Sequence, residues 1–350
     1  MKRLREHALF WPASTLLLLL AVSALFNPAF LSITWQDGHL YGSVIDILNR
    51  AAPLVIVSLG MTLVIAVRGL DISVGAVVAI SAAVVALMIG GSFSADGAVE
   101  SRYPLWLALG TALAVAAACG LWNGMLVVKA GMQPIVATLI LMVAGRGIAQ
   151  LLTGGQIITV YYPPFFTLGN GYLLGLPVAL WIAALTFVVL YLLLSRTALG
   201  LFVRAIGGNP EAARVAGVRS SAITLCVYTF CGFAAGIAGL IVSSNVKSAD
   251  ANNAGNLLEL DAILAVTLGG TALTGGRFTL AGTVLGALII QTLTSIIYSF
   301  GVPPEVNLVV KAALVFAVML LQSAEFRAMV WRVARPAAQR GARADQGASR

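Results

Sequence analysis

Residues 196–220 group charged, amide and small side chains in a spacing that suits contact with a soluble partner. They contain four arginines, a Gly-Gly-Asn-Pro break at residues 207–210 and an acidic and small run at residues 211–213. Because the stretch separates two apolar runs of membrane length, it predicts a solvated helix-turn-helix that serves as a docking surface. A solvated connector that carries only topological charge is the alternative. The residues expected to contact the partner are Arg204, Asn209, Glu211, Ala212, Ala213 and Gly217.

Four ionisable residues near the ends of apolar runs have a structural explanation. Asp46 and Arg50 are four residues apart, which predicts an ion pair on the surface of one helix. Glu259 and Asp261 fall in the first turn of another predicted helix, where the helix dipole favours anions. Helix stabilisation is therefore the expected role of all four, and a functional role is the alternative.

Two cations lie deeper inside apolar runs, Arg146 in the fifth run and Lys311 in the last. A buried cation must find a carboxylate, a carbonyl or water. Pairing with Glu259 or Asp261 and lining a wet pathway are both left open.

Residues 244–256 are dense in amides and include one carboxylate. Such groups suit the hydroxyls of a sugar, which need donors and acceptors rather than charge, but a solvated loop has the same composition. The candidates for the substrate path or for contact with a delivering protein are Asn123, Arg146, Asn245, Asp250, Asn252, Asn253, Glu259, Asp261 and Lys311.

Two glycine-rich turns are predicted on one side of the membrane, at residues 69–75 and 269–277. Glycine permits positive φ and close helix approach, which both a sharp turn and a tight bundle require. Asp71 or Ser73 is placed to cap the helix that follows the first turn. The turn residues singled out are Gly69, Asp71, Ser73, Gly75, Gly269, Gly270, Gly275 and Gly276.

Several catalytic and nucleotide-binding patterns are absent from the sequence. No lysine follows a glycine, so there is no Gly-x-x-x-x-Gly-Lys phosphate loop. No nucleophile elbow or His-Glu-x-x-His helix occurs, and the histidines and cysteines lack metal-ligand spacing. We therefore expect no catalytic residue, no metal site and no cofactor bound by this chain.

The composition predicts an all-α polytopic membrane protein. The 350 residues are 60% hydrophobic and 10% charged, whereas a soluble domain has roughly 25% charged residues. A spanning helix needs about 20 mostly apolar residues. Ten runs approach that length, and the first is expected to remain as a span rather than to be a cleaved signal peptide. They lie near residues 10–26, 46–67, 72–91, 104–128, 134–152, 174–194, 222–244, 258–272, 280–299 and 305–321.

Charge then orients the predicted helices, because short cytoplasmic loops collect Lys and Arg. With both termini inside, most of the 21 basic residues fall on the cytoplasmic side, apart from Arg50, Arg102, Arg146, Lys247 and Lys311. The net charge of +8 is then mainly a topology signal with some attraction to anionic lipid, so nucleic-acid binding is not expected.

The predicted organisation is a single transmembrane domain, residues 1–326, with residues 196–220 as its cytoplasmic docking loop. A basic tail, residues 327–350, has little to bury and is expected to be disordered in the cytoplasm. Helices two to five and seven to ten cross the membrane in opposite order, which is compatible with an inverted repeat.

With these residues in place, the chain resembles the permease subunits of ATP-binding-cassette importers for monosaccharides, the group of the ribose, arabinose and xylose permeases. The resemblance rests on residues 69–75, on 133–139 with Arg146-Gly147, on 259–263, and on the glycine pairs at 269–270 and 275–276. Residues 36–38, 43–53 and 249–255 are most similar to permeases of bacterial galactofuranose importers.

The resemblance implies a multi-pass protein of the bacterial inner membrane that imports a monosaccharide. It implies separate cytoplasmic ATPase subunits that use ATP and Mg²⁺, a periplasmic sugar-binding protein and a second permease copy, as in a homodimer. Glu211-Ala212-Ala213 with Gly217 is similar to the permease loop whose short helix docks on the ATPase, although the Leu-Pro that continues that motif is missing after Ile223.

Two other function classes are alternatives to an ATP-driven importer. In a proton-coupled secondary transporter, Glu259, Asp261, Arg146 and Lys311 would form a proton relay. In a membrane receptor or scaffold, the loop would only recruit a soluble partner.

Overall fold

The computed structural model describes residues 9–26, 28–36, 38–90, 92–93, 99–301 and 304–322. It divides into two compact units, residues 1–292 and 293–350. The predicted single domain over residues 1–326 stays a prediction, and the basic tail lies outside the described residues.

Each of the ten predicted apolar runs coincides with a helix, so the helical class is confirmed. Six of these helices, α3, α5, α6, α8, α11 and α13, are long and apolar enough to cross a membrane. The ten helices are α2 (Phe10–Phe26), α3 (Ser43–Ala66), α4 (Val74–Ile89), α5 (Leu105–Val128), α6 (Pro134–Thr153), α8 (Val178–Arg196), α11 (Ser220–Val246), α12 (Leu258–Leu268), α13 (Leu280–Ser299) and α14 (Pro304–Gln322).

Between these helices lie short elements, most of which have no periodic signal in the sequence. The helical ones are η1 (Pro28–Leu31), α7 (Pro163–Asn170), α9 (Leu199–Gly208) and α10 (Pro210–Val215), and only α9 and α10 were predicted. Four antiparallel pairings join β1 (Thr34–Gln36) to β2 (His39–Tyr41), β3 (Ser92–Phe93) to β4 (Val99–Glu100), β5 (Ile158–Thr159) to β8 (Ser248–Ala249), and β6 (Tyr172–Leu173) to β7 (Leu176–Pro177).

The centre of the first unit is formed by α3, α4 and α11. Of the most apolar window of α3, 83% is buried, compared with 17% for α8, so α3 is internal and α8 peripheral. Helix α11 packs against α3, α4 and α5, and α4 also packs against α6. Helix α4 contains no charged residue and is rich in Ala and Val, which suits a helix enclosed on nearly every side.

The crossing of α5 and α11 depends on small residues. On α5, Ala112, Ala116 and Gly120 recur every four residues and are buried. A β-carbon added at Gly232 of α11 would lie 2.5 Å from the carbonyl oxygen of Ala116 and 2.7 Å from the amide nitrogen of Gly120. The two backbones are therefore in direct contact, as expected where van der Waals packing rather than the hydrophobic effect holds helices together.

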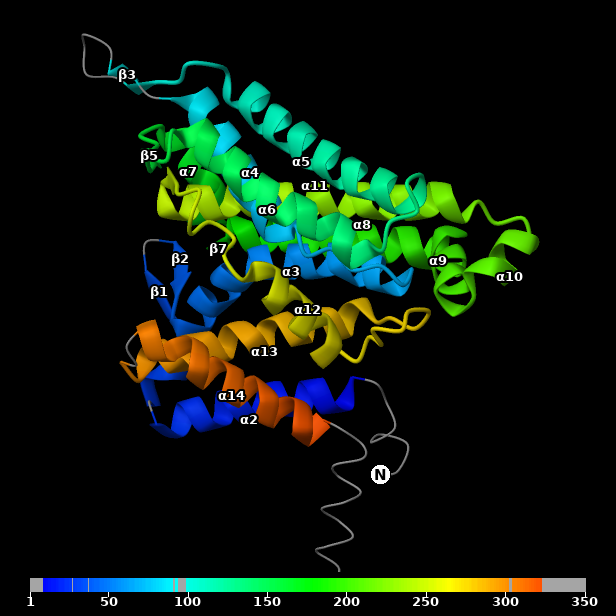
Figure 1. The fold of residues 1–350 in the computed structure, drawn as a ribbon. Coiled ribbons are helices and arrows are strands. Elements are labelled where there is room, and N and C mark those ends of the chain that lie inside the picture. The colour runs from blue at the N-terminus through cyan, green and yellow to red at the C-terminus, as the bar shows by residue number, and fades with distance from the viewer. Residues whose placement is uncertain are drawn as a thin grey trace, which may run out of the picture. The chain divides into compact units, whose positions relative to one another are not determined.

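Within the first unit, the short elements gather at two opposite ends. Figure 1 shows α9 and α10 at one end, and the pair β1–β2, β5 and α7 at the other. We call the end that holds α9 and α10 the basic end, for the charges described below.

We predict that Gly232→Leu destabilises the protein by roughly 1–3 kcal/mol or more, because the added side chain overpacks the α5–α11 contact. Thermal unfolding of the detergent-solubilised protein, followed by size-exclusion chromatography, measures the effect. Gly110→Leu is the matched control, since a β-carbon at this exposed glycine of α5 meets nothing within 4 Å. Equal melting temperatures for the two variants would contradict the role assigned to the crossing.

Candidate functional site: the basic end and its coupling segment

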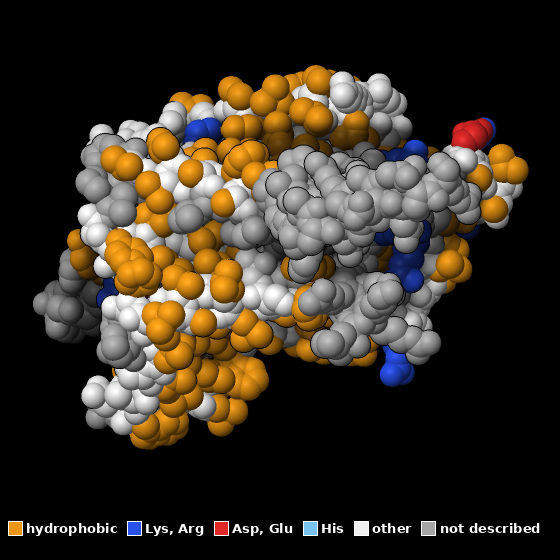
Figure 2. Space-filling view, turned by 90° about the horizontal axis from the view of Figure 1, so that it is seen from below, with side chains coloured by type: hydrophobic (Ala, Val, Ile, Leu, Met, Phe, Trp, Pro, Cys, Tyr) orange, Lys and Arg blue, Asp and Glu red, His pale blue; other side chains and the backbone are white. Residues whose placement is uncertain are grey.

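Basic side chains are exposed at the ends of several helices on the side of α9 and α10. Figure 2 shows Lys and Arg gathered mainly at that end, with hydrophobic side chains over much of the remaining visible surface. A soluble partner would meet this charged end, whereas the apolar flanks suit hydrocarbon. The exposed basic residues of the helix ends and turns are Arg68, Lys129, Arg196, Arg204, Arg214, Arg219 and Arg277.

The coupling segment, residues 196–220, forms the predicted pair of helices. The Oδ1 atom of Asn209 accepts hydrogen bonds from the amides of Glu211 and Ala212, both at 3.1 Å, and so caps α10. Pro210 occupies the first turn, where its missing N–H costs nothing. Gly217 follows the helix with a φ of 84°, and its amide donates to the carbonyl of Arg214 at 3.0 Å.

Helix α10 presents a small charged and apolar tip to solvent. Glu211 and Arg214 form an ion pair at 2.5 Å, with about 70% of each side chain exposed. The hydrogen bond and charge of Arg214 lower the pKa of Glu211 below its ordinary value. Val215 is 80% exposed beside this pair, whereas Ala213 is buried. The tip therefore combines an exposed apolar residue with fixed charges, which is a suitable composition for a docking surface.

Helix α9 is held against the two glycine turns. The guanidinium of Arg204 lies over the ring of Phe278, 5.3 Å from its centroid. Arg68 donates from Nε to the carbonyl of Gly207 at 2.7 Å and from a terminal nitrogen to the carbonyl of Gly208 at 2.5 Å. In the sequence, Arg68 is only one of the basic residues counted on the cytoplasmic side, because no pattern links it to residues about 140 positions away.

The first glycine turn contains a buried polar cluster rather than a solvated cap. Asp71 is 1% exposed, and its Oδ1 accepts from the amide of Ser73 at 3.0 Å and from the Ser73 hydroxyl at 2.6 Å. The side-chain amide of Asn123 on α5 donates to the Ser73 hydroxyl at 2.8 Å. Ser73 is the N-cap residue of α4, but its side chain makes no capping hydrogen bond, and Asp71 binds the amide of Ser73 rather than an amide of α4, so the predicted side-chain cap is wrong.

The buried start of α4 also meets the chain that leads into α12. A β-carbon at Gly75 would collide with a carboxylate oxygen of Glu259 and with the carbonyl of Gly255. Glu259 is 4% exposed and, with Asp261, lies in the first turn of α12 as predicted. Only glycine at position 75 leaves room for the Glu259 carboxylate beside the N-terminus of α4. The dipole of α4 favours an anion at this end.

Arg146 binds the backbone of the segment that precedes α12. Its Nη1 donates to the carbonyl of Ala251 at 3.1 Å and to that of Ala254 at 2.6 Å, so its direct partners are backbone carbonyls. The residues on either side of these carbonyls form an irregular backbone between β8 and α12. Arg146 therefore satisfies carbonyl groups that no regular element pairs.

The amide-rich segment is folded on itself. Asp250 accepts from the amides of Asn252 and Asn253 at 2.9 Å and 3.2 Å, and the side chain of Asn253 adds a third hydrogen bond at 2.6 Å. These bonds lower the pKa of Asp250, the largest contribution being that of the Asn253 side chain. Asn252 accepts from Gln150 at 2.6 Å. The side-chain amides of Asn252 and Asn253 are exposed and accessible, but each already makes a hydrogen bond within the protein.

The remaining predicted residues are dispersed. The Asp46–Arg50 pair is confirmed at 2.9 Å and is exposed. Asn245 lies beside Gly169 at the end opposite α10, where its carbonyl accepts from Asn170 at 3.2 Å. Lys311 belongs to the second unit, on α14.

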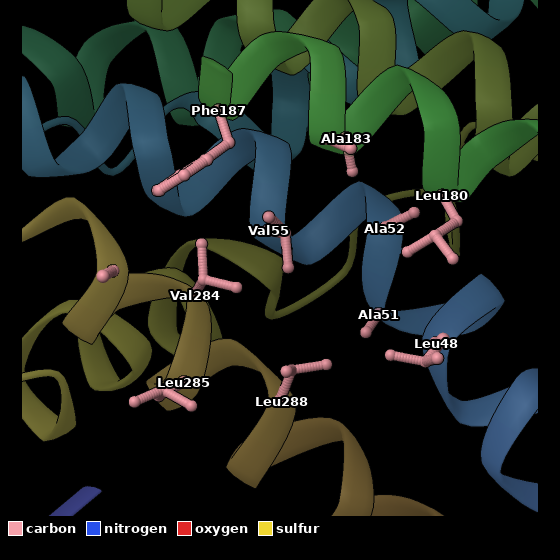
Figure 3. Close-up of a pocket in the computed structure, with 12 residues that line it drawn as sticks. Leu48, Ala51, Ala52, Val55, Leu180, Ala183, Phe187, Val284, Leu285 and Leu288 are labelled. Atoms are coloured by element: carbon pink, nitrogen blue, oxygen red, sulfur yellow. The ribbon is translucent and has the colours of Figure 1, made fainter. Parts of the chain in front are cut away.

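A cavity of about 440 Å³ between α3, α8 and α13 is unsuited to a sugar. Figure 3 shows aliphatic side chains and Phe187 converging on it, and all the lining residues are apolar. Sugar hydroxyls placed there would lose their hydrogen bonds to water without replacement. The cavity suits hydrocarbon, so the polar path must lie elsewhere. Its lining is Leu48, Ala51, Ala52, Val55, Leu180, Ala183, Ala184, Phe187, Ala281, Val284, Leu285 and Leu288.

The amino-acid sequence of the chain matches a known family. Residues 43–319 match the family model described as branched-chain amino acid transport system / permease component. The chain is 49% identical over 325 residues to the galactofuranose transporter permease protein YtfT of Escherichia coli (strain K12), covering 91% of this chain and 92% of that protein. No solved structure matches the chain.

Two further relatives are import permeases named for other sugars. The fructose import permease protein FruF of Bifidobacterium longum is 36% identical over 92% of this chain and 89% of its own length. The ribose import permease protein RbsC of Escherichia coli (strain K12) is 34% identical over 88% of this chain and 91% of its own length.

We predict that Arg146→Met releases the 250–256 segment while leaving the helices folded, because carbonyls of that segment lose their donor. Hydrogen exchange followed by mass spectrometry should show faster exchange at residues 250–256 and little change in α6. Gln150→Ala is the control, since it removes one exposed hydrogen bond to the same segment. Unchanged exchange in Arg146→Met would show that the guanidinium does not hold the segment.

Proposed function

The chain belongs to this permease family, and on that premise we propose that it is the membrane subunit of an ATP-driven importer for galactofuranose. As a permease subunit it is not an enzyme, and ATP hydrolysis belongs to a separate subunit. The relative named for galactofuranose shares 49% identity over nearly the whole chain, and others are named for fructose and ribose. Several relatives thus support a monosaccharide as the substrate, whereas one relative supports galactofuranose as that monosaccharide.

The observation that carries the proposal is how residues 196–220 are folded and held against the bundle. Helix α10 is exposed and capped at both ends, and α9 beneath it is fastened to both glycine turns. An exposed, rigidly mounted helix is suited to receive force from a soluble ATPase that uses ATP and Mg²⁺. A loosely attached loop could dock but could not transmit displacement into the bundle.

The proposed topology places the basic end in the cytoplasm of a bacterium and the chain in its inner membrane, with ten spans and both termini inside. The exposed basic residues at the helix ends support this orientation. The inverted repeat of helices two to five and seven to ten stays part of this proposal. The start of α4 meets the start of α12 at Gly75, Gly255 and Glu259.

Two further partners complete the proposed assembly. A sugar-binding protein would deliver substrate to the end opposite α10, where Asn252 and Asn253 are exposed. A second permease copy would enclose the path together with this one. The proton-coupled alternative is not favoured, since Arg146 is engaged by carbonyls and the relatives are import permeases.

We predict that galactofuranose uptake into proteoliposomes requires ATP, the ATPase subunit and the binding protein. Uptake should be absent with a nonhydrolysable ATP analogue, because the permease cycle needs hydrolysis to reset. Fructose and ribose serve as competing sugars. Uptake that follows a pH gradient without the ATPase would overturn the importer assignment.

We also predict that Glu211→Lys and Gly217→Arg abolish co-purification of the ATPase, or transport, without removing the permease from the membrane. Reversal of charge breaks the Glu211–Arg214 pair, and an arginine at φ 84° is strained. Gly217→Asn is the control, because asparagine tolerates this conformation. Normal transport by both test variants would show that α10 is not the coupling element.

A further inference from the structure

Arg68 stands at the point where three segments distant in sequence meet. It follows α3 by two residues, adopts a φ of 65° and has an exposed side chain. A non-glycine residue in this left-handed conformation is uncommon and persists only where its surroundings impose it. The reason for the conformation should therefore be sought in what the side chain and its neighbours contact.

The side chain of Arg68 binds the carboxyl end of α9. Its two hydrogen bonds go to Gly207 and Gly208, the last two residues of that helix. These carbonyls have no partner within α9, and the negative end of the helix dipole attracts a cation. The planar guanidinium reaches both carbonyls at once, which a lysine ammonium on its flexible stem does less well.

The backbone beside Arg68 is in direct contact with α9 and with the second glycine turn. A β-carbon at Gly207 would collide with the carbonyl of Ala66 and the amide of Gly276. That amide already donates to the Ala66 carbonyl at 3.0 Å. A β-carbon at Gly275 would lie 2.7 Å from Cγ of Arg68. Movement of α9 must therefore displace the turn that begins at residue 67.

That turn continues directly into the interior of the bundle. Three residues after Arg68, Asp71 binds Ser73, and Ser73 is bonded to Asn123 of α5. Helix α4 then starts, and its Gly75 abuts Glu259. A displacement at residue 68 thus reaches the buried starts of α4 and α12 within a few residues.

We propose that Arg68 is the positioning residue that transmits displacement of α9 and α10 to the turn before α4, and so couples ATP hydrolysis to opening of the sugar path. The assignment presupposes the ATP-driven import proposed above. Arg68 contacts the end of α9, on which α10 is carried, but not the exposed tip of α10. Its loss should therefore spare binding of the ATPase and impair the transmission of movement from α9 to the turn before α4.

The test compares Arg68→Ala and Arg68→Lys with Arg102→Ala in the full reconstituted complex. Arg102→Ala removes the same charge at an exposed arginine that lies outside the basic end and both glycine turns. The readouts are ATPase co-purification, ATP hydrolysed per sugar transported, and hydrogen exchange at residues 69–73 with and without ATP.

For Arg68→Ala we expect normal co-purification, a ratio of ATP to sugar raised at least about fivefold, and loss of the ATP-dependent change in exchange. Arg68→Lys should be intermediate and Arg102→Ala normal. A wild-type ratio in Arg68→Ala, or a rise as large in Arg102→Ala, would overturn the role of Arg68. Loss of ATPase binding in both Arg68 variants would also overturn it. Absence of ATP-dependent uptake by the wild-type complex would instead reject the importer function.

Discussion

Backbone groups at helix breaks must find partners inside the protein, because hydrocarbon and a packed core offer none. Three side chains meet this need at three breaks. Arg68 binds the carbonyls that end α9, Arg146 binds carbonyls in the irregular stretch before α12, and Asp71 binds the amide before α4. A hydropathy count treats these charged side chains as exceptions in apolar segments. They are nevertheless the groups that satisfy the backbone hydrogen bonds left open at the helix breaks.

Glycine supplies the complementary half of this arrangement. At Gly75, Gly207 and Gly232 the neighbouring backbone or carboxylate lies where a β-carbon would be. Such contacts leave no space for relative sliding, so the elements that share them move together or separate. Helix α9 and the two turns that touch it at Gly207 are therefore packed to move together as one rigid body.

Polarity also divides the molecule by function. The cavity between α3, α8 and α13 offers no polar group, while the buried polar side chains Asp71, Asn123 and Glu259 sit at the starts of α4 and α12 and on the adjacent α5. These buried groups follow directly on the turn that Arg68 joins to α9. A permease that opens by moving those helix starts would change the environment of Asp71, Asn123 and Glu259 in each cycle.

Local signals in the sequence were enough to predict the ten long helices and α10, namely the long apolar runs and the Asn-Pro-Glu start of α10. The Asp46–Arg50 pair was predictable for the same reason, as its partners are one turn apart. The two- and three-residue strands were missed because so short a segment has no readable period.

The partners of the isolated charges follow from the packing of the helices and not from the sequence spacing. Arg146 could have bound a carboxylate, and a carbonyl more than 100 residues away was selected by how α6 packs. Arg68 carried no signal beyond its charge, because its contact with Gly207 joins segments 139 residues apart. Such contacts follow from the geometry of the whole bundle, which sequence spacing does not encode.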